Sequence, residues 1–289
     1  MELENRDFFT DPIIKISNKD LKPLSNSYFG QHKGLHSGWY KQSVLDQIEQ
    51  IPTLFDILKD NGFVKDNEIV WPSYKINKLG FRSEDWLSGN KGAIFLGCSD
   101  VFGVGNYLES TAAQIISDHL KVANYNLSIP GGGLDQAYRV LKYHIKNINA
   151  DYVFLLIPEV SRREFFTDSN SVLINPQSFS VTSITKDQLD GYFPEDKLED
   201  VYFKLFCESK NILLQTNKNI DAIRYVCEKN NKILITLKNP IYYQDRESLE
   251  IKRNATKGIF GKRKDLACDL HHPGKNFQKE IAKKLLKKL

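Results

Sequence analysis

Hydrophobic and polar positions follow two alternating patterns beyond about residue 91. Short runs of apolar residues predict buried strands, at residues 93–97, 122–129, 151–158 and 232–237. Longer segments with apolar residues at helical spacing predict amphipathic helices, at residues 107–121 and 133–148, around 217–230 and from about 275. This alternation of strands and helices is typical of an α/β protein.

The predicted strands are apolar throughout, rather than at every second residue. Such strands indicate a mainly parallel sheet that is covered by helices on both faces. In sheets of this kind the ligand binds outside the carboxyl ends of the strands. We therefore expect functional residues just after positions 97, 129, 157 and 237.

The first 67 residues lack this alternation. Helical periodicity over residues 43–63 is interrupted by Pro52. We predict an N-terminal extension over residues 1–67 and one α/β domain over residues 68–289. Two long polar segments of that domain follow strand ends and can wall a pocket: residues 167–196, and residues 239–267 with the basic residues Lys252, Arg253, Lys257, Lys262, Arg263 and Lys264.

The composition narrows the classes of protein to consider. With 40 basic and 36 acidic residues, the net charge of +4 is too small to indicate nucleic-acid binding. The four cysteines have no C-x-x-C spacing, which favours free thiols in a reducing compartment over a zinc site or disulfides. The N-terminus lacks the features of a signal peptide, and no apolar run is long enough to span a membrane. We expect a cytoplasmic protein, or one released without such a signal.

The C-terminal segment is amphipathic and basic. Phe277, Ile281, Leu285 and Leu289 recur every four residues, with lysines opposite them in KKLLKKL, residues 283–289. The pattern predicts a helix that covers the sheet and keeps a solvated face. A basic surface for nucleic acid or a membrane is the alternative.

The sequence GCSDVFGVGN, residues 97–106, follows the first predicted strand. Ser99 at this turn has its hydroxyl at the carboxyl edge of the sheet, and its backbone N–H can face an oxyanion. The alternative is that Ser99 only caps the following helix, as serine commonly does. The glycines here fit neither a Walker A loop nor a G-x-G-x-x-G fingerprint.

The sequence NLSIPGGGLDQ, residues 126–136, follows the second predicted strand. Its consecutive glycines, Gly131, Gly132 and Gly133, let the backbone approach a ligand closely at the start of a helix. A phosphate-binding loop and a simple tight turn are the alternatives.

The sequence CDLHHPG, residues 268–274, precedes the last predicted helix. Asp269 lies three residues before His272, so it can accept the Nδ1–H of that histidine and leave Nε2 to take a proton from a hydroxyl. Metal binding by His271 and His272 is one alternative, although adjacent side chains diverge and no third ligand has suitable spacing. The other alternative is a loop at the start of a helix with no chemical role. If the two histidines bind no metal, His271 is structural or lines a pocket.

Ser99, the glycine loop and the Asp269–His272 pair map to one edge of one predicted sheet, in the order Ser…Asp…His that occurs on α/β scaffolds. At these residues the sequence resembles the SGNH (GDSL-type) hydrolase family. FLGCSDVFGVGN is similar to the family's nucleophile block, with Cys98 in place of the usual Asp. NLSIPGGGLDQ and DLHHPG are similar to its second and last blocks, and YKINKLGFRSEDW to the segment before the first. The resemblance covers about residues 70–289.

The resemblance implies a three-layer α/β/α, flavodoxin-like fold with a mainly parallel sheet. It implies Ser99 as the nucleophile, His272 as the base and Asp269 as the acid that orients it. The backbone N–H groups of Ser99 and Gly131 would bind the oxyanion. The implied reaction is hydrolysis of an acyl or acetyl ester of a small molecule or carbohydrate through a covalent acyl-enzyme, with no metal and no organic cofactor.

The sequence departs from the family in the third block, which normally supplies an Asn after the third strand. Here residues 157–166 read IPEVSRREFF and contain no Asn. Losing one oxyanion donor typically lowers a rate by about 10²–10³-fold. Either Ser161 or Arg162 replaces the Asn as an oxyanion donor, or the activity is weak. Arg162 can offer several N–H donors and a charge, but it equally suits a role as an anchor of its loop. The alternative function is a catalytically weak or inactive binding or structural module on the same fold.

Overall fold

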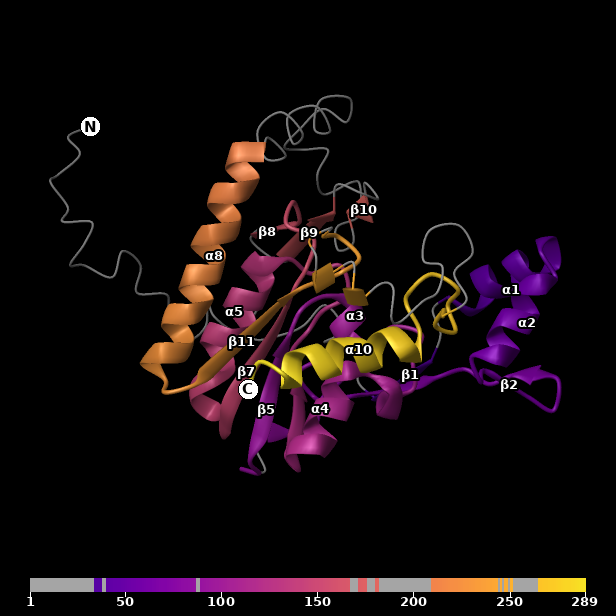
Figure 1. Ribbon diagram of the computed structural model, residues 1–289, viewed down its shortest axis with the longest axis horizontal. Coiled ribbons are helices and arrows are strands. Elements are labelled where there is room, and N and C mark those ends of the chain that lie inside the picture. Colours follow the sequence, from indigo (N-terminus) through magenta and orange to yellow (C-terminus); the bar gives the residue numbers. More distant parts are fainter. Residues whose placement is uncertain are drawn as a thin grey trace, which may run out of the picture.

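The computed structural model has a four-stranded parallel sheet at its centre (Figure 1). It describes residues 34–37, 40–86, 89–166, 171–175, 180–181, 209–243, 245, 247–248, 250–251 and 265–289. The strand order is β11-β7-β5-β6. The bounds are Gly92–Leu96 for β5, Ala123–Asn126 for β6, Ala150–Ile157 for β7 and Ile233–Lys238 for β11. Each of these strands was predicted from the sequence.

Both faces of this sheet are buried. Successive residues of a strand point to opposite faces, so each strand contributes to two hydrophobic clusters. One cluster contains Ile94, Leu96, Val153 and Leu155, and the other contains Ala93, Phe95, Phe154 and Leu156. In the second cluster Phe95 and Phe154 stack with ring centroids 5.2 Å apart. Burial on both faces explains why the strands are apolar throughout.

Helices cover each face of the sheet. Helices α4 (Ala112–Leu120) and α10 (Lys275–Leu286) contribute to the cluster of Phe95 and Phe154. Helices α5 (Leu134–His144) and α8 (Ser209–Lys229) contribute to the other cluster. Figure 1 shows α8 beside α5 and α10 beside α4. The predicted three-layer α/β/α architecture is therefore confirmed.

Helix α10 covers the sheet in the way that its apolar stripe predicted. Phe277, Ile281 and Leu285 are buried in the core, whereas Leu289, beyond the helix, is 52% exposed.

None of the helices in the described ranges is both long enough and apolar enough to cross a membrane.

Smaller elements surround this domain. Three short helices lie between larger elements: α3 (Ser99–Phe102) follows β5, η4 (Leu108–Ser110) precedes α4, and η5 (Ile145–Asn147) follows α5. Three antiparallel sheets pair β1 (Gly34–Ser37) with β4 (Ser73–Ile76), β2 (Val64–Lys65) with β3 (Glu68–Ile69), and β8 (Arg163–Phe166) with β9 (Ser171–Asn175) and β10 (Ser180–Val181). Residues 1–33, Cys207, the predicted basic cluster at 252–264 and most of the polar segment 167–196 lie outside the described residues.

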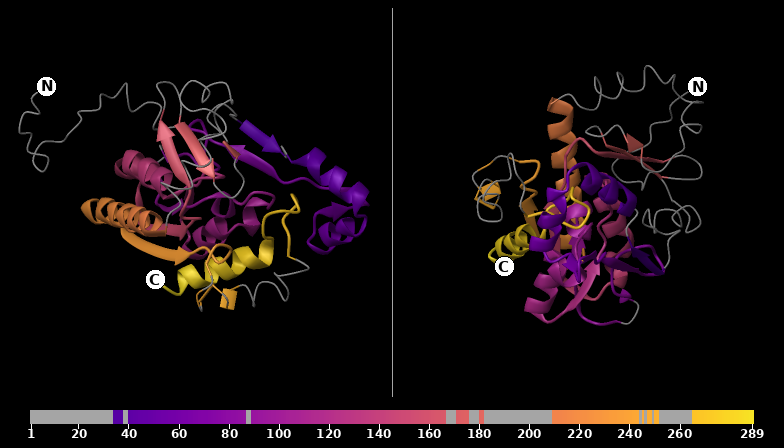
Figure 2. Two further views of the ribbon diagram at one scale, coloured as in Figure 1. Left: turned by 90° about the horizontal axis from the view of Figure 1, so that it is seen from above. Right: turned by 90° about the vertical axis from the view of Figure 1, so that its right-hand side faces the viewer.

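The described part of the predicted N-terminal extension packs against the loops at the carboxyl edge of the sheet. Val44 of α1 (Lys41–Gln50) and Leu58 of α2 (Thr53–Asp60) share a buried cluster with Tyr74, Phe102 and Cys268. Figure 2 shows α1 and α2 at the opposite end of the molecule from α8. The extension therefore contacts the two segments that carry Ser99 and His272.

A buried arginine fixes the loop that follows α3. Arg82 Nη1 donates to Phe102 O at 3.1 Å and to Gly103 O at 2.8 Å, and its Nη2 donates to Asn106 O at 3.0 Å. The guanidinium lies 4.4 Å from the centroid of the Tyr74 ring. Burial lowers the pKa of Arg82 to about 10, which leaves it charged at neutral pH. A single charged side chain therefore holds three carbonyl oxygens of one loop.

We expect Arg82→Met to lower the free energy of unfolding by about 3 kcal/mol or more. Methionine fills part of the space but leaves three carbonyl oxygens without their donors, at a cost of about 1–3 kcal/mol for each one that stays buried. Urea denaturation followed by circular dichroism measures the change. The control Arg224→Met, exposed on α8, should change stability by less than about 0.5 kcal/mol. Equal stability of the two variants would contradict the role of Arg82.

Candidate active site

Ser99 lies at the turn between β5 and α3. Cys98 is the N-cap residue of α3 and makes no side-chain capping bond, and Ser99 is the first helical residue. The alternative that Ser99 is only a helix cap is therefore wrong. Ser99 is 7% exposed and lies at the carboxyl edge of the sheet, where ligands of parallel sheets bind.

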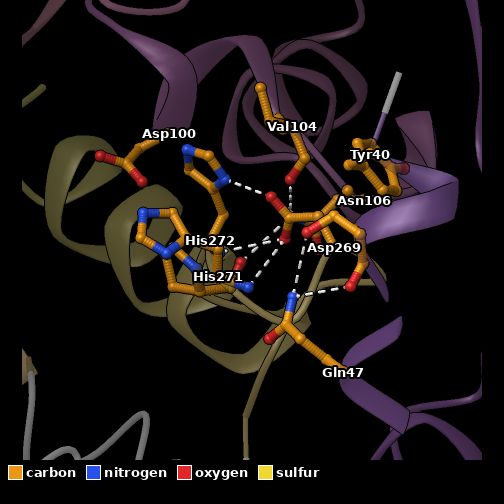
Figure 3. A network of polar contacts seen from close by, with 12 residues as sticks. Tyr40, Gln47, Asp100, Val104, Asn106, Asp269, His271 and His272 are labelled. Atoms are coloured by element: carbon orange, nitrogen blue, oxygen red, sulfur yellow. Dashed lines mark hydrogen bonds and ion pairs between the residues drawn. The ribbon is translucent and has the colours of Figure 1, made fainter. Parts of the chain in front are cut away.

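A hydrogen bond of 2.5 Å joins His272 Nδ1 to Asp269 Oδ2 (Figure 3). The other carboxylate oxygen, Oδ1, accepts the backbone N–H of His271 at 3.2 Å and of His272 at 3.0 Å. Both carboxylate oxygens are occupied, so Asp269 is held in one orientation. Because an ionised Asp269 only accepts, Nδ1 carries the proton and Nε2 is the basic nitrogen of a neutral His272.

The surroundings make His272 more basic and keep Asp269 ionised. Burial alone lowers the pKa of His272, but the hydrogen bond and charge of Asp269, with the charge of Asp100, raise it above the ordinary value of 6.5. Burial raises the pKa of Asp269, but hydrogen bonds from His272 and His271 outweigh it, so that pKa lies below its ordinary value. Arg162 acts on the pKa of His272 in the opposite direction to Asp100. Asp100 and Arg162 are thus electrostatic neighbours of His272.

His271 is exposed, and its ring diverges from that of His272, with an interplanar angle of 82°. Across the residues that the structure describes, no group of three or more His, Cys, Asp or Glu side chains is arranged to hold a metal ion. The bond from Asp269 to His272 favours the acid-and-base interpretation of CDLHHPG over the metal pair.

Hydrogen bonds attach the segment of Asp269 and His272 to the loop after α3. Cys268 N donates to Gly105 O at 2.8 Å, and Asn106 Nδ2 donates to Pro273 O at 3.1 Å. Gly105 has a φ of +71°, and an added Cβ would lie 2.8 Å from both Ala267 Cβ and Asp269 Oδ1. Only glycine suits this close approach. The segment is therefore joined to the loop that follows α3, the short helix that begins at Ser99.

A second carboxylate, that of Asp100, is buried beside the candidate nucleophile. Asn239 Nδ2 donates to Asp100 Oδ2 at 2.6 Å, and Cys98 Sγ donates to the same oxygen at 3.5 Å. Gln278 of α10 donates to the Asp100 carbonyl at 2.9 Å. Asp100 Oδ1 has no hydrogen-bond partner among the described residues. Asp100 therefore joins the ends of β5 and β11 to α10 and leaves one charged oxygen uncommitted.

The glycine loop after β6 approaches the end of β7. Gly131 has a φ of +77°, which favours glycine. A Cβ on Gly133 would lie 2.8 Å from the carbonyl oxygen of Arg162, so the two loops touch. The backbone N–H groups of Ser99 and Gly131 donate to no group within the described residues. Both are available to a ligand.

The segment after β7, where the resemblance predicts an Asn, contains the two candidate substitutes Ser161 and Arg162. Ser161 donates to Glu159 Oε1 through its hydroxyl at 2.6 Å and its N–H at 2.9 Å, so its hydroxyl is already used. Arg162 Nη2 donates to Tyr242 OH at 3.0 Å, whereas its Nε and Nη1 are buried with no hydrogen-bond partner in the described chain. Burial lowers the pKa of Arg162, but its interactions with Cys98, Tyr242, Asp100 and Glu159 outweigh this and keep that pKa above its ordinary value. Arg162 Nε also forms an ion pair of 4.0 Å with Glu159 Oε2. Of the two candidates, Arg162 is the one with donors that make no hydrogen bond in the described chain.

The structure joins some of the predicted site residues and not others. Asp269 and His272 are bonded, and the segments of Ser99, Gly131 and Arg162 meet at one edge of the sheet. Among the described contacts, no hydrogen bond links Ser99 Oγ to His272. Hydrogen bonds of a catalytic site are often long without substrate and shorten when it binds.

Sequence reasoning missed Asp100, Asn239 and Tyr242. A signal existed for each: Asp100 follows the candidate nucleophile, and Asn239 and Tyr242 follow the end of β11, where functional residues were expected. Their contacts join residues far apart in the sequence: Asn239 and Asp100 are separated by 139 positions, and Tyr242 and Arg162 by 80. A local motif does not contain that information.

We expect the pKa of His272 to lie above 6.5 and to fall in Asp100→Asn. The negative charge of Asp100 stabilises the imidazolium, so its removal makes the proton leave at lower pH. NMR titration of the His272 ring measures this without substrate. Asp221→Asn on α8 removes an exposed carboxylate and should leave the pKa unchanged. An unchanged or higher pKa in a folded Asp100→Asn protein would refute the effect.

The chain was also compared with known proteins. No protein-family model and no curated protein matches it. Among solved structures, it is similar to the psychrotrophic esterase EstA from Pseudoalteromonas sp., with 15% identity, 69% of this chain and 96% of that chain covered, and a TM-score of 0.38. An acetylxylan esterase from Geobacillus stearothermophilus has 13% identity, coverage of 69% and 94%, and a TM-score of 0.32. An α/β hydrolase enzyme from the metagenome of Lake Arreo, Spain, has 16% identity, coverage of 69% and 94%, and a TM-score of 0.29.

Proposed function

We propose that this protein is a serine hydrolase that cleaves ester bonds, with Ser99 as nucleophile, His272 as base and Asp269 as the acid that orients the base. The observation that carries the proposal is the bond of 2.5 Å between Asp269 and His272, in a segment that is hydrogen-bonded to the loop after Ser99. A neutral imidazole oriented by a carboxylate is the general base that a serine nucleophile needs.

In the first half of the reaction, Ser99 Oγ attacks the carbonyl carbon of the ester. His272 Nε2 takes the hydroxyl proton as the new C–O bond forms, and Asp269 stabilises the resulting imidazolium. The tetrahedral intermediate then collapses, its bond to the leaving oxygen breaks, and His272 returns the proton to the leaving alcohol. The product of this half is an acyl-enzyme on Ser99.

In the second half, water takes the place of the alcohol. His272 removes one proton from the water as its oxygen attacks the acyl carbon, and then protonates Ser99 Oγ when the acyl bond breaks. The carboxylic acid leaves and Ser99 regains its hydroxyl. Every proton in the cycle passes through His272 Nε2, so no metal ion or organic cofactor is required by the scheme.

The developing oxyanion needs donors that are in place before the reaction. The uncommitted N–H groups of Ser99 and Gly131 are two candidates, and we propose Arg162 as the third. Its Nη1 and Nε make no hydrogen bond within the described chain, although Nε lies 4.0 Å from Glu159 Oε2 in an ion pair. The free hydrogen-bonding capacity of Nη1 supports this role, as does the contact of the Arg162 backbone with the glycine loop at Gly133. An arginine also adds a positive charge, which the usual Asn does not.

The substrate class follows only from the family resemblance. It implies an acyl or acetyl ester of a small molecule or of a carbohydrate.

We expect Ser99→Ala to lower the turnover of p-nitrophenyl acetate by about 10⁴–10⁶-fold, because no nucleophile is left for His272 to activate. A fluorophosphonate probe should label the wild type at Ser99, as read by peptide mass spectrometry. Ser43→Ala, exposed on α1, is the matched control and should keep both properties. A folded wild type that neither reacts with the probe nor hydrolyses the ester would support an inactive module instead.

We expect Arg162→Ala to lower kcat by about 10²–10³-fold with a smaller change in KM, because an oxyanion donor acts mainly in the transition state. Arg162→Lys keeps the charge but loses the planar set of donors, so its kcat should lie between those of the wild type and Arg162→Ala. Steady-state kinetics on p-nitrophenyl acetate separate kcat from KM. Wild-type kcat in a folded Arg162→Ala protein would show that Arg162 only anchors its loop.

A further inference from the structure

A groove beside β4 is lined by residues that the proposed reaction does not use. Its volume is about 1070 Å³, and its lining comes from β4, the segment after β4, and the start of α4. Neither Ser99 nor His272 borders it. The groove is therefore a separate site, and any ligand in it must be inferred from its own lining.

Part of the lining is apolar and aromatic. Val70 and Leu108 are 41% and 42% exposed, and Trp71 and Tyr107 border the groove with them. The Tyr107 ring stacks on Phe63 with centroids 5.3 Å apart, and its hydroxyl donates to Val70 O at 2.8 Å. These contacts fix the aromatic surface in advance, so a ligand loses little affinity to ordering it.

Side-chain amides form another part of the lining. Asn124 Nδ2 donates to Gln114 Oε1 at 3.1 Å, and Gln114 Nε2 donates to Asp118 at 2.7 Å. Asn124 is only 2% exposed, yet its Oδ1 has no hydrogen-bond partner within the described chain. Together these side chains give the groove wall amide groups that can donate to and accept from a polar ligand.

The charged residues of the lining balance one another. The basic ones are Lys75, Lys78 and Arg82, and the acidic ones are Glu84, Asp85 and Glu109. A polyanion such as a nucleic acid needs a surplus of basic groups, which this groove lacks. A lipid chain needs an apolar lining, and the amides and charges would then lose their hydration without compensation.

We propose that this groove binds a segment of a neutral oligosaccharide. A sugar ring presents C–H groups that pack on aromatic faces and hydroxyl groups that pair with amides and carboxylates. Typical ligand sites have volumes of about 300–1,000 Å³, so this groove has room for more than one sugar ring. The inference goes beyond ester hydrolysis, because it assigns a binding site that does not need Ser99.

Isothermal titration calorimetry with cellohexaose, xylohexaose and N-acetylchitohexaose tests the inference on the full chain. We expect saturable binding of at least one hexasaccharide, equal in the wild type and in Ser99→Ala. Trp71→Ala removes an aromatic face, and Ser73→Trp fills the groove from an exposed position on β4. Each should weaken binding by at least about tenfold. Tyr225→Ala, an exposed aromatic residue on α8, is the matched control and should bind as the wild type does.

The possible results separate this inference from the proposed hydrolase. Failure of all three hexasaccharides to bind overturns it, as does binding that both Trp71→Ala and Ser73→Trp leave unchanged. Binding lost only in Ser99→Ala would place the sugar at the candidate catalytic site and also overturn it. A protein that binds a hexasaccharide through Trp71 but cleaves no ester would keep this inference and lose the proposed function.

Discussion

The candidate site depends on the hydrogen bonds that attach the segment of Asp269 and His272 to the loop after α3. The segment of Asp269 and His272 lies about 170 positions after Ser99, and hydrogen bonds to Gly105 and from Asn106 hold it to the loop after α3, the helix that Ser99 begins. That loop is in turn fixed by Arg82, whose guanidinium holds three of its carbonyl oxygens. Because an imidazole must lie within hydrogen-bond reach of the hydroxyl it activates, errors in this attachment would separate base from nucleophile. The buried polar contacts around Arg82 therefore matter for chemistry as well as for stability.

The elements of the central domain could be predicted from sequence because their hydrophobic pattern is local. Strands buried on both faces are continuously apolar, and β5, β6, β7 and β11 were each found this way. Helix α8 was predicted to start near residue 217 but begins at Ser209. Its first turns have no buried stripe, since Leu213 and Leu214 are 62% and 64% exposed, so periodicity could not reveal them. The packing of α1 and α2 on the loops near Ser99 and His272 depends on contacts between residues far apart in the sequence. Such contacts leave no local hydrophobic pattern from which they could be predicted.

In the candidate site, too, local features could be predicted from the sequence, whereas contacts between distant residues could not. The pairing of Asp269 with His272 could be predicted because three residues of sequence determine it. The position of Asp100 could not, since its partners Asn239 and Gln278 come from β11 and α10. The segment without the expected Asn shows the limit of motif reasoning: the sequence left Ser161 and Arg162 both open as substitutes, and Arg162 suited a loop anchor equally well. The hydrogen bond of the Ser161 hydroxyl to Glu159 favours Arg162, whose Nε and Nη1 make no hydrogen bond in the described chain. Nε forms an ion pair of 4.0 Å with Glu159, whereas Nη1 has neither kind of partner among the described residues. A buried donor without a partner is costly unless a ligand uses it, which is the physical reason to propose a function for Arg162.

The central claim is that Ser99, His272 and the donors of Gly131 and Arg162 act on one carbonyl group. A crystal structure of the protein after reaction with a fluorophosphonate tests it most directly, because the tetrahedral phosphorus resembles the intermediate of ester hydrolysis. The account predicts a covalent bond to Ser99 Oγ, a phosphonyl oxygen within about 3 Å of Gly131 N and an Arg162 nitrogen, and His272 Nε2 next to Ser99 Oγ. Phosphorus on another residue, or a phosphonyl oxygen that faces away from Gly131 and Arg162, would contradict it.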